Sequence, residues 1–275
     1  MHLWSTYHEK LSRHRSHRKP GRRCAALRIL QAHTGSNTHA LVRSTTQTDA
    51  LGHQGIDTRV GDYTDRASLR TAFRGIDGLL FVSSPALDPN VRIEQHKAVV
   101  QEAVSAGVEH IVYTSAMGAQ HDPGHRTTEI ELQEIGVSHT VLRNALYSDA
   151  FAAKVINDME SGPIVSAGAG SSLVTSSIAD LAEAAVIALT FPPTKQVWEL
   201  RGPAWTFDQL AEAVSAELGR TIEHREVGDL ETGPFAVLFP LIRKGIFSEE
   251  SDDLATLLQR APQPIEAVVA QLCRS

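Results

Sequence analysis

The chain has 275 residues, 42% of them hydrophobic and 21% charged, and this balance excludes a disordered or fibrous protein. It is long enough to bury a large core, as one compact unit or as two closely docked units. Two cysteines, Cys24 and Cys273, provide neither a metal-binding spacing nor a disulfide framework, so we expect a reducing cytoplasm. No apolar run approaches the roughly 20 residues that a membrane span needs.

The net charge of −6 conceals an asymmetry along the chain. Residues 1–28 hold eight Lys or Arg and a single acidic residue, Glu9, whereas the remainder holds 18 basic and 31 acidic residues. An acidic body does not favour nucleic acid as a partner. A short basic arm is typical of a phosphate-binding tail or a targeting peptide, so the first 28 residues need their own explanation.

From about residue 38 the chain alternates short apolar runs with amphipathic helical patterns. Strands are predicted at 39–43, 56–60, 79–82, 108–113, 138–142 and 197–200, and helices at 66–73, 91–106 and 178–189, with a capping box, Thr206-Phe-Asp-Gln209, opening a helix to Leu218. Strands that are apolar on both faces indicate a parallel sheet covered by helices on each side. We therefore predict a doubly wound α/β fold.

Several short stretches carry a resemblance to a known family. They are Ala40-Leu-Val-Arg43, Gly61-Asp-Tyr63, His110-Ile-Val-Tyr-Thr-Ser115, Leu142-Arg-Asn-Ala-Leu-Tyr147, Trp205-Thr-Phe-Asp208 and Ser251-Asp-Asp-Leu254. Over roughly residues 28–275 the chain resembles the NmrA-like atypical short-chain dehydrogenases, and within them the type-2 NADPH quinone reductases and triphenylmethane reductases. The resemblance implies a Rossmann-like dinucleotide-binding domain in residues 28–145 and a smaller α/β domain on the substrate side in residues 146–275, with elements returning to the sheet.

The resemblance places one end of the cofactor near Arg43. This residue stands where the family holds the adenosine phosphate of NADPH, and a guanidinium that binds a phosphate bidentately favours NADP over NAD. Its alternative is a solvated charge at the end of a strand. Asp62 and Tyr63 would lie near the adenine, although Asp62 could equally be a helix N-cap.

The resemblance places the other end of the cofactor beside Ser83 and Ser84. These residues would follow the strand that passes beneath the nicotinamide, but serines before Pro85 are also ordinary turn residues. His96, on the next predicted helix, would either face the cofactor or pack inside the protein.

The proton donor of ordinary short-chain dehydrogenases is missing. Those enzymes use a Tyr and a Lys four residues later, whereas Tyr113 is followed at that spacing by Met117. Hydride delivery to a quinone can still proceed, because the hydroquinone anion is stabilised by its ring and water can protonate it. The protein then mainly orients the reactants and excludes water. This favours quinones or cationic dyes over simple ketones.

Four polar residues are the catalytic candidates that the resemblance implies at the border of the acceptor pocket: Tyr113, Ser115, Asn144 and Tyr147. Each could instead be a hydrogen-bonded core residue. His125 and Glu129, at helical spacing, are weaker candidates for a proton relay, with a plain surface pair as the alternative. The histidines show no pattern of metal ligands.

The glycine loop of the family is absent from the sequence. The family opens with a buried strand and Thr-Gly-x-Thr-Gly-x-Leu-Gly-Gly, whose backbone N–H groups meet the pyrophosphate. Here Arg13-His-Arg-Ser-His-Arg-Lys-Pro-Gly-Arg-Arg-Cys-Ala25 stands in its place, and side chains of that size cannot form the loop. With allowed codon choices, Arg13 to Ala26 read one nucleotide later can encode Gly-Thr-Gly-Val-Thr-Gly-Asn-Leu-Gly-Gly-Ala-Val-Leu, which contains the fingerprint.

Residues 1–27 are therefore interpreted first as a frameshift product. A basic arm for nucleic acid, a transit-like peptide and a pseudoenzyme that has lost cofactor binding are the rival explanations. Because losing a central strand exposes both neighbouring strands, we expect the chain as written to be impaired in folding or cofactor affinity.

The expected function is NADPH-dependent hydride transfer to a quinone-like or other conjugated acceptor by a cytoplasmic enzyme. The expected partners are that small acceptor and a second copy of the chain, and neither a membrane nor nucleic acid is expected. The alternative is a redox-sensing regulator in the NmrA manner, which binds the dinucleotide or a protein partner without turnover.

Overall fold

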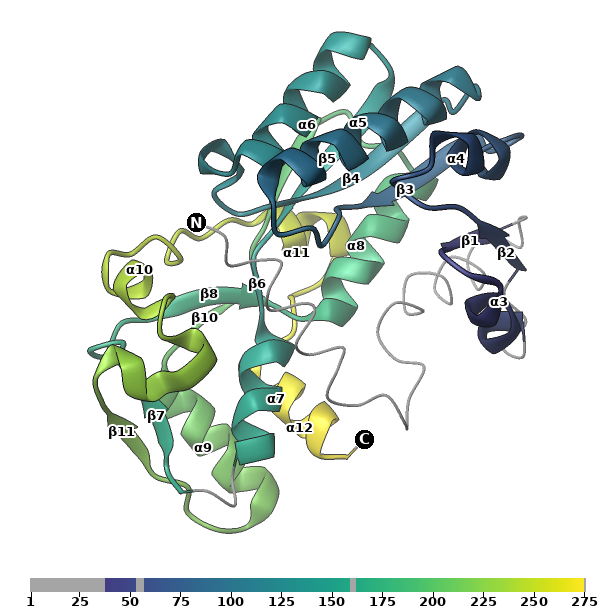
Figure 1. Ribbon diagram of the computed structural model, residues 1–275. Coiled ribbons are helices and arrows are strands. Elements are labelled where there is room, and N and C mark those ends of the chain that lie inside the picture. Colours follow the sequence, from purple (N-terminus) through teal and green to yellow (C-terminus); the bar gives the residue numbers. More distant parts are fainter. Residues whose placement is uncertain (1–37, 53–56, 159–161, 275) are drawn as a thin grey trace. The chain divides into compact units, whose positions relative to one another are not determined.

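The structure is a computed structural model that describes residues 38–52, 57–158 and 162–274 (Figure 1). The chain divides into two compact units. The first unit comprises residues 1–143 and 182–198, and the second comprises residues 144–181 and 199–275. Parallel strands alternate with helices through the first unit, which confirms the predicted α/β class.

The first unit is built on parallel strands covered by helices. Its strands are β1 (His39–Val42), β2 (Asp57–Val60), β3 (Gly78–Val82), β4 (His110–Ala116), β5 (Ser138–Asn144) and β9 (Val197–Leu200), of which the last two run on across the unit boundary. Its helices are α3 (Thr45–Gly52), α4 (Arg66–Ala72), α5 (Pro89–Ser105), a short 3₁₀ turn η2 (Ala119–His121), α6 (Pro123–Ile135) and most of α8 (Ile178–Thr190). Figure 1 shows α5 and α6 together on one face of the β3–β5 strands and α8 on the other.

The described strands of this unit form two separate ladders. β1 pairs in parallel with β2, and a four-stranded sheet runs in the order β3-β4-β5-β9. β3 and β4 are parallel, with Phe81 opposite Tyr113. Among the described strands, β1 therefore pairs only with β2, and β3 only with β4.

Local signals explain where the elements begin and end. Asp65 is the N-cap of α4, because its carboxylate accepts hydrogen bonds from two backbone N–H groups of the first turn. The alternative of Asp62 as a helix N-cap is therefore wrong. After α5, the N–H of Val108 donates to the carbonyl of Ala103 and closes the helix, so β4 begins at His110, two residues later than predicted.

The core of the first unit is apolar where the helices meet the sheet. Phe81, Val100, Ile111, Leu132 and Val141 are among its buried members. α6 joins this core through Gly124, His125, Thr128 and Leu132, a buried face on which only Leu132 is a large apolar side chain. Asp122 caps the helix and Gly136 ends it in a left-handed conformation.

The second unit is a smaller mixture of short strands and helices. Its further elements are β6 (Leu146–Tyr147), α7 (Ser148–Asp158), β7 (Ile164–Ser166), β8 (Leu173–Ser176), β10 (Ala204–Trp205), α9 (Phe207–Leu218), β11 (His224–Glu226), η3 (Asp229–Phe235), α10 (Phe239–Arg243), α11 (Asp253–Leu258) and α12 (Ile265–Cys273). β10, β8 and β6 form one small sheet, and β11 pairs with β7. The predicted capping box is confirmed, because Thr206 and Gln209 each bond the other's backbone N–H. Within the described part of the chain, the helices are too short or too polar to cross a membrane.

Candidate functional site

Arg43 and Asp62 lie together beyond the end of β1. The N–H of Gly61 donates to the carbonyl of Val42 at 2.9 Å, which joins the segment after β2 to the end of β1. Hydrogen bonds from the Thr64 hydroxyl and backbone lower the pKa of Asp62, and the exposed guanidinium of Arg43 lowers it further. The pair of charges stands at the carboxyl edge of the parallel strands, where open α/β sheets bind ligands.

Tyr63 connects this corner with the end of β3. Its hydroxyl donates to the carbonyl of Val82 at 3.0 Å, and its ring meets Phe81 edge-on with 5.7 Å between ring centroids. Tyr63 therefore links the segment that carries Asp62 to the end of β3, where the next loop begins.

The loop after β3 is held through its backbone. The N–H of Ser83 donates to the Thr114 hydroxyl at 3.1 Å, and the N–H of Ser84 donates to Nε2 of His96 at 2.8 Å. The Ser84 hydroxyl donates to the side-chain oxygen of Gln95. Ser84 is buried and its hydroxyl is committed inside the protein, so the loop is shaped by bonds to β4 and α5.

A cluster of buried polar rings lies behind this loop. Tyr113 is fully buried, and its hydroxyl lies 2.7 Å from Nδ1 of His125. Burial raises the pKa of Tyr113 well above its ordinary value, and burial lowers the pKa of His96 to about 3 and that of His125 to about 4. Tyr113 thus has the surroundings of a hydrogen-bonded core residue. His125 is 4% exposed, so the alternative of a plain surface pair for it and Glu129 is wrong.

Ser115 lies at the head of a second polar chain. Its hydroxyl donates to Glu129 at 2.6 Å, and Arg143 donates to both oxygens of the same carboxylate at 3.1 and 2.6 Å. The burial of α6 against β4 and β5 explains why Glu129 faces inward at this point. With its proton committed to Glu129, the Ser115 oxygen can offer only lone pairs to a ligand.

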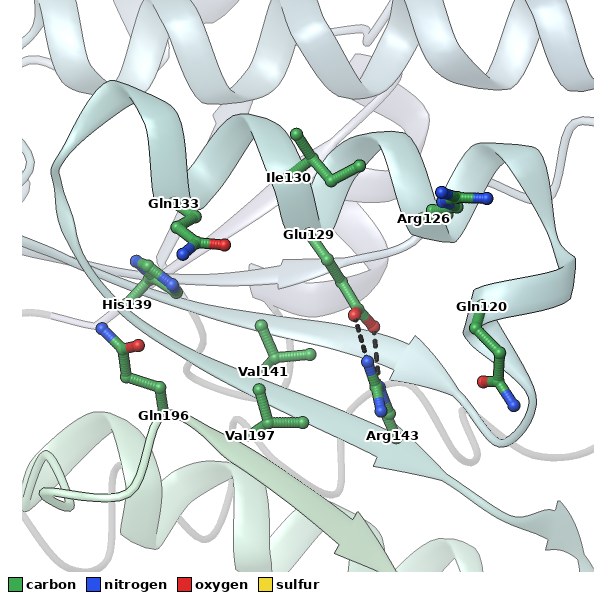
Figure 2. Close-up of a pocket in the computed structure, with 10 residues that line it drawn as sticks. All are labelled: Gln120, Arg126, Glu129, Ile130, Gln133, His139, Val141, Arg143, Gln196 and Val197. Atoms are coloured by element: carbon green, nitrogen blue, oxygen red, sulfur yellow. Dashed lines mark hydrogen bonds and ion pairs between the residues drawn. The ribbon is translucent and has the colours of Figure 1, made fainter.

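The pair of Glu129 and Arg143 also borders a pocket of about 450 Å³ in the first unit (Figure 2). Figure 2 shows Val141 of β5 and Val197 of β9 beneath α6, with the ion pair between these valines and the side chains of Arg126 and Gln120. Polar side chains, including those of Gln133, His139 and Gln196, line the rest. The sequence pattern gave no signal of this pocket, because residues 196 and 197 complete a wall that is otherwise formed by residues 120–143.

Asn144 and Tyr147 belong to the second unit. Burial raises the pKa of Tyr147 to about 12, an effect reduced by a hydrogen bond with the Asn144 side chain. Asn144 is itself buried, and within the described part of the chain its Oδ1 has no hydrogen-bond partner. An unsatisfied buried carbonyl costs about 1–3 kcal/mol, so this oxygen is an acceptor that the described residues leave available for a donor.

Each unit, taken by itself, holds polar groups that suit one part of a dinucleotide. Arg43, Asp62 and Tyr63 can receive an adenosine phosphate and an adenine, and the unsatisfied Oδ1 of Asn144 suits an N–H or O–H donor such as a carboxamide. The anomalous segment in residues 1–27, on which the pyrophosphate loop and the frameshift interpretation depend, lies outside the described residues.

Known proteins resemble the chain over most of its length. The NAD(P)H-binding family matches residues 18–189 of the chain. Over 210 residues the chain is 31% identical to quinone oxidoreductase 2 of Escherichia coli (strain K12), which covers 74% of this chain and 73% of that protein.

Solved structures give the same result. Triphenylmethane reductase of Citrobacter sp., complexed with NADP(H), has a TM-score of 0.82 and 32% identity, covering 90% of this chain and 94% of that one. The NADPH-dependent quinone oxidoreductase of Escherichia coli, complexed with NADPH, has a TM-score of 0.80 and 27% identity, covering 90% and 95%. The predicted Rossmann-like fold is confirmed. The chain therefore belongs to the NAD(P)H-binding family and is similar to quinone and triphenylmethane reductases.

Proposed function

We propose that the chain is an NADPH-dependent oxidoreductase that transfers a hydride directly to a quinone-like or other conjugated acceptor. Its similarity to a quinone oxidoreductase and to a triphenylmethane reductase supports this class of acceptor. The alternative function is a redox-sensing regulator that binds the dinucleotide or a protein partner without turnover. It would have the same fold, and the assay described below distinguishes it from the enzyme.

The observation that carries the proposal is the state of Tyr113. Its hydroxyl is fully buried, its pKa is raised by that burial, and Met117 stands where a lysine would lower the pKa of a catalytic tyrosine. A phenol in this state is a poor proton donor to a substrate. The favoured acceptors are therefore those whose reduced form needs no strong acid, namely quinones and cationic conjugated dyes.

When bound, NADPH supplies the hydride. Arg43 would bind the adenosine phosphate through paired N–H···O bonds, which favours NADP over NAD, and Asp62 and Tyr63 would lie near the adenine. Ser83 and Ser84 would border the nicotinamide end through their loop.

Three further residues would orient the reactants. The carboxamide N–H groups of the nicotinamide would donate to the unsatisfied Oδ1 of Asn144 and to the lone pairs of Ser115 that Glu129 leaves available. Tyr147, with its raised pKa, stays neutral and would donate a hydrogen bond without losing its proton. Orientation and exclusion of water are thus the protein's main contributions, and water protonates the reduced product.

The test is NADPH oxidation by the purified chain with three acceptors: a naphthoquinone, a triphenylmethane dye and a simple ketone such as cyclohexanone. We expect turnover with the quinone and the dye and none above background with the ketone. Tight NADPH binding without oxidation by any acceptor would support the sensing regulator and reject the enzyme. Efficient reduction of the ketone would contradict the argument from Tyr113.

A further inference from the structure

A buried imidazole holds the backbone of the loop that follows β3. We propose that His96 is a positioning residue, which fixes the Ser83–Ala86 loop for NADPH by accepting a hydrogen bond from the Ser84 N–H. This inference rests on the proposed function, since it assigns that loop to the cofactor. It replaces the expectation that His96 itself touches the cofactor.

The tautomer of His96 follows from its neighbours. The Ser84 N–H can only donate, so Nε2 of His96 must be unprotonated to accept its bond at 2.8 Å. The Thr128 hydroxyl gives its proton to the carbonyl of Gly124 at 2.8 Å, so it accepts from Nδ1 of His96 at 2.7 Å. His96 is therefore the neutral Nδ1–H tautomer, and both of its ring nitrogens are bonded within the protein.

The ring has no freedom to leave this position. It is fully buried and meets Phe81 and Tyr113 edge-on, with centroid distances of 5.1 and 5.7 Å. Burial and the nearby His125 and Arg92 disfavour a charged His96. The acceptor at Nε2 is thus held in one place and in one protonation state across the neutral pH range.

The far end of the loop is held in a similar way. Nε of Arg92 donates to the carbonyl of Ala86 at 3.0 Å, and Arg92 forms an ion pair with Asp122 at 3.2 Å. Asp122 is also the N-cap of α6, the helix that carries Thr128. His96 and Arg92 lie four residues apart on α5, so they are on the same face of this helix. From that face they bind the loop at two places, the N–H of Ser84 and the carbonyl of Ala86.

The remaining hydrogen bonds of the loop involve the Ser84 side chain and the Ser83 backbone. The Ser84 hydroxyl accepts from the N–H of Ala86 at 3.1 Å and donates to Gln95, while the N–H of Ser83 is bonded to Thr114. The Ser84 side chain therefore shapes the loop. Its shape depends on acceptors supplied by α5 and β4, and among them only His96 holds the backbone of Ser84.

Two conservative variants separate the role of Nε2 from mere packing. The longer amide in His96→Gln can place an oxygen near the position of Nε2, whereas the shorter amide in His96→Asn reaches only the position of Nδ1 and leaves the Ser84 N–H without its acceptor. Both variants remove the imidazole and its contacts with Phe81 and Tyr113, and they differ from each other by one methylene. We expect NADPH dissociation constants within about threefold of wild type for His96→Gln and at least tenfold weaker for His96→Asn.

Amide hydrogen exchange at Ser84, measured without cofactor, provides a readout that does not depend on activity. We expect slow exchange in wild type and His96→Gln and fast exchange in His96→Asn. Equal exchange rates at Ser84 in the two variants, or equal NADPH affinities, would overturn the positioning role. NADPH binding by wild type without oxidation of any acceptor would contradict the proposed function and leave this result intact.

Discussion

Nε2 of the buried His96 accepts a hydrogen bond of 2.8 Å from the backbone N–H of Ser84. The bond joins the interior of the first unit to the carboxyl end of β3, and that edge is where open α/β sheets bind ligands. Changes in the buried cluster of His96, Tyr113 and His125 should therefore act on the cofactor as well as on stability.

Two of the buried histidines, His96 and His125, predict a fall in the free energy of unfolding at mildly acidic pH. Burial depresses the folded-state pKa of His96 to about 3 and of His125 to about 4, from an ordinary 6.5. Above pH 6.5 these rings are unprotonated in both the folded and the unfolded chain. Below pH 6.5 the rings of the unfolded chain bind protons, whereas those of the folded chain stay neutral. The free energy of unfolding should fall as pH drops from about 6.5 to 5, by up to roughly 1.4 kcal/mol per pH unit for each ring.

Urea unfolding at pH 7, 6 and 5 measures this dependence. The exposed His121 provides the control, because His121→Gln should leave the slope unchanged. The double variant His96→Gln with His125→Asn should flatten it. A slope that is the same in the double variant and in wild type would refute the assignment to these rings.

Replacing Arg43 should separate NADPH from NADH. We expect Arg43→Ala to raise the KM for NADPH by roughly 10- to 100-fold and to leave that for NADH nearly unchanged, because a charge-assisted bond to phosphate is worth about 1.5–3 kcal/mol. Steady-state kinetics with both cofactors measures the effect, and the exposed Arg74 of the same unit, changed to Ala, is the matched control. An equal rise in KM for both cofactors would mean that Arg43 does not bind the phosphate that distinguishes NADPH from NADH.

Replacing Asn144 should change activity much more than stability. Its buried Oδ1 lacks a partner among the described residues, so Asn144→Leu removes an unsatisfied acceptor while it loses the bond to Tyr147. We expect the free energy of unfolding to stay within about 1 kcal/mol of wild type and kcat/KM for the acceptor to fall at least tenfold. Tyr147→Phe, which keeps Oδ1, should lose less activity. Full activity in Asn144→Leu would remove this residue from the site.

The anomalous N-terminus leads to a prediction about the sheet. Among the described strands β1 and β3 are each paired on one side only, and an unpaired side of a strand is open to a further strand. Replacing residues 13–26 by the frame-restored Gly-Thr-Gly-Val-Thr-Gly-Asn-Leu-Gly-Gly-Ala-Val-Leu should raise the Tm and tighten NADPH binding at least tenfold. Calorimetry on the two chains measures both quantities. If the coding DNA reads correctly in frame through the basic stretch, the frameshift explanation fails.

Much of the fold could be predicted because it depends on local apolar patterns. The strand at 197–200 was predicted at its observed bounds, and the helix at 178–189 ends one residue later than predicted. α6 gave no such pattern, because its buried face carries Gly124, His125 and Thr128. A polar face becomes buried only when partners from other elements satisfy it, and the sequence does not show those partners.

The site was harder to predict than the fold for the same reason. Ser84 and His96 are 12 residues apart and His96 and Thr128 are 32 apart, so each bond depends on the tertiary structure. The sequence alone left Tyr113 as either a pocket residue or a core residue, and burial decides between such alternatives. Resemblance supplied the candidate positions, and only geometry distinguishes a ligand contact from a residue that positions one.

Direct hydride transfer to a conjugated carbon is the central claim, and isotope tracing tests it most directly. The chain is incubated with NADPH carrying deuterium at the transferable position and with a cationic triphenylmethane dye, and the leuco product is analysed by mass spectrometry. The account predicts one deuterium on the central carbon of the product. Bleaching of the dye without deuterium, or bound NADPH that is never oxidised, would contradict it.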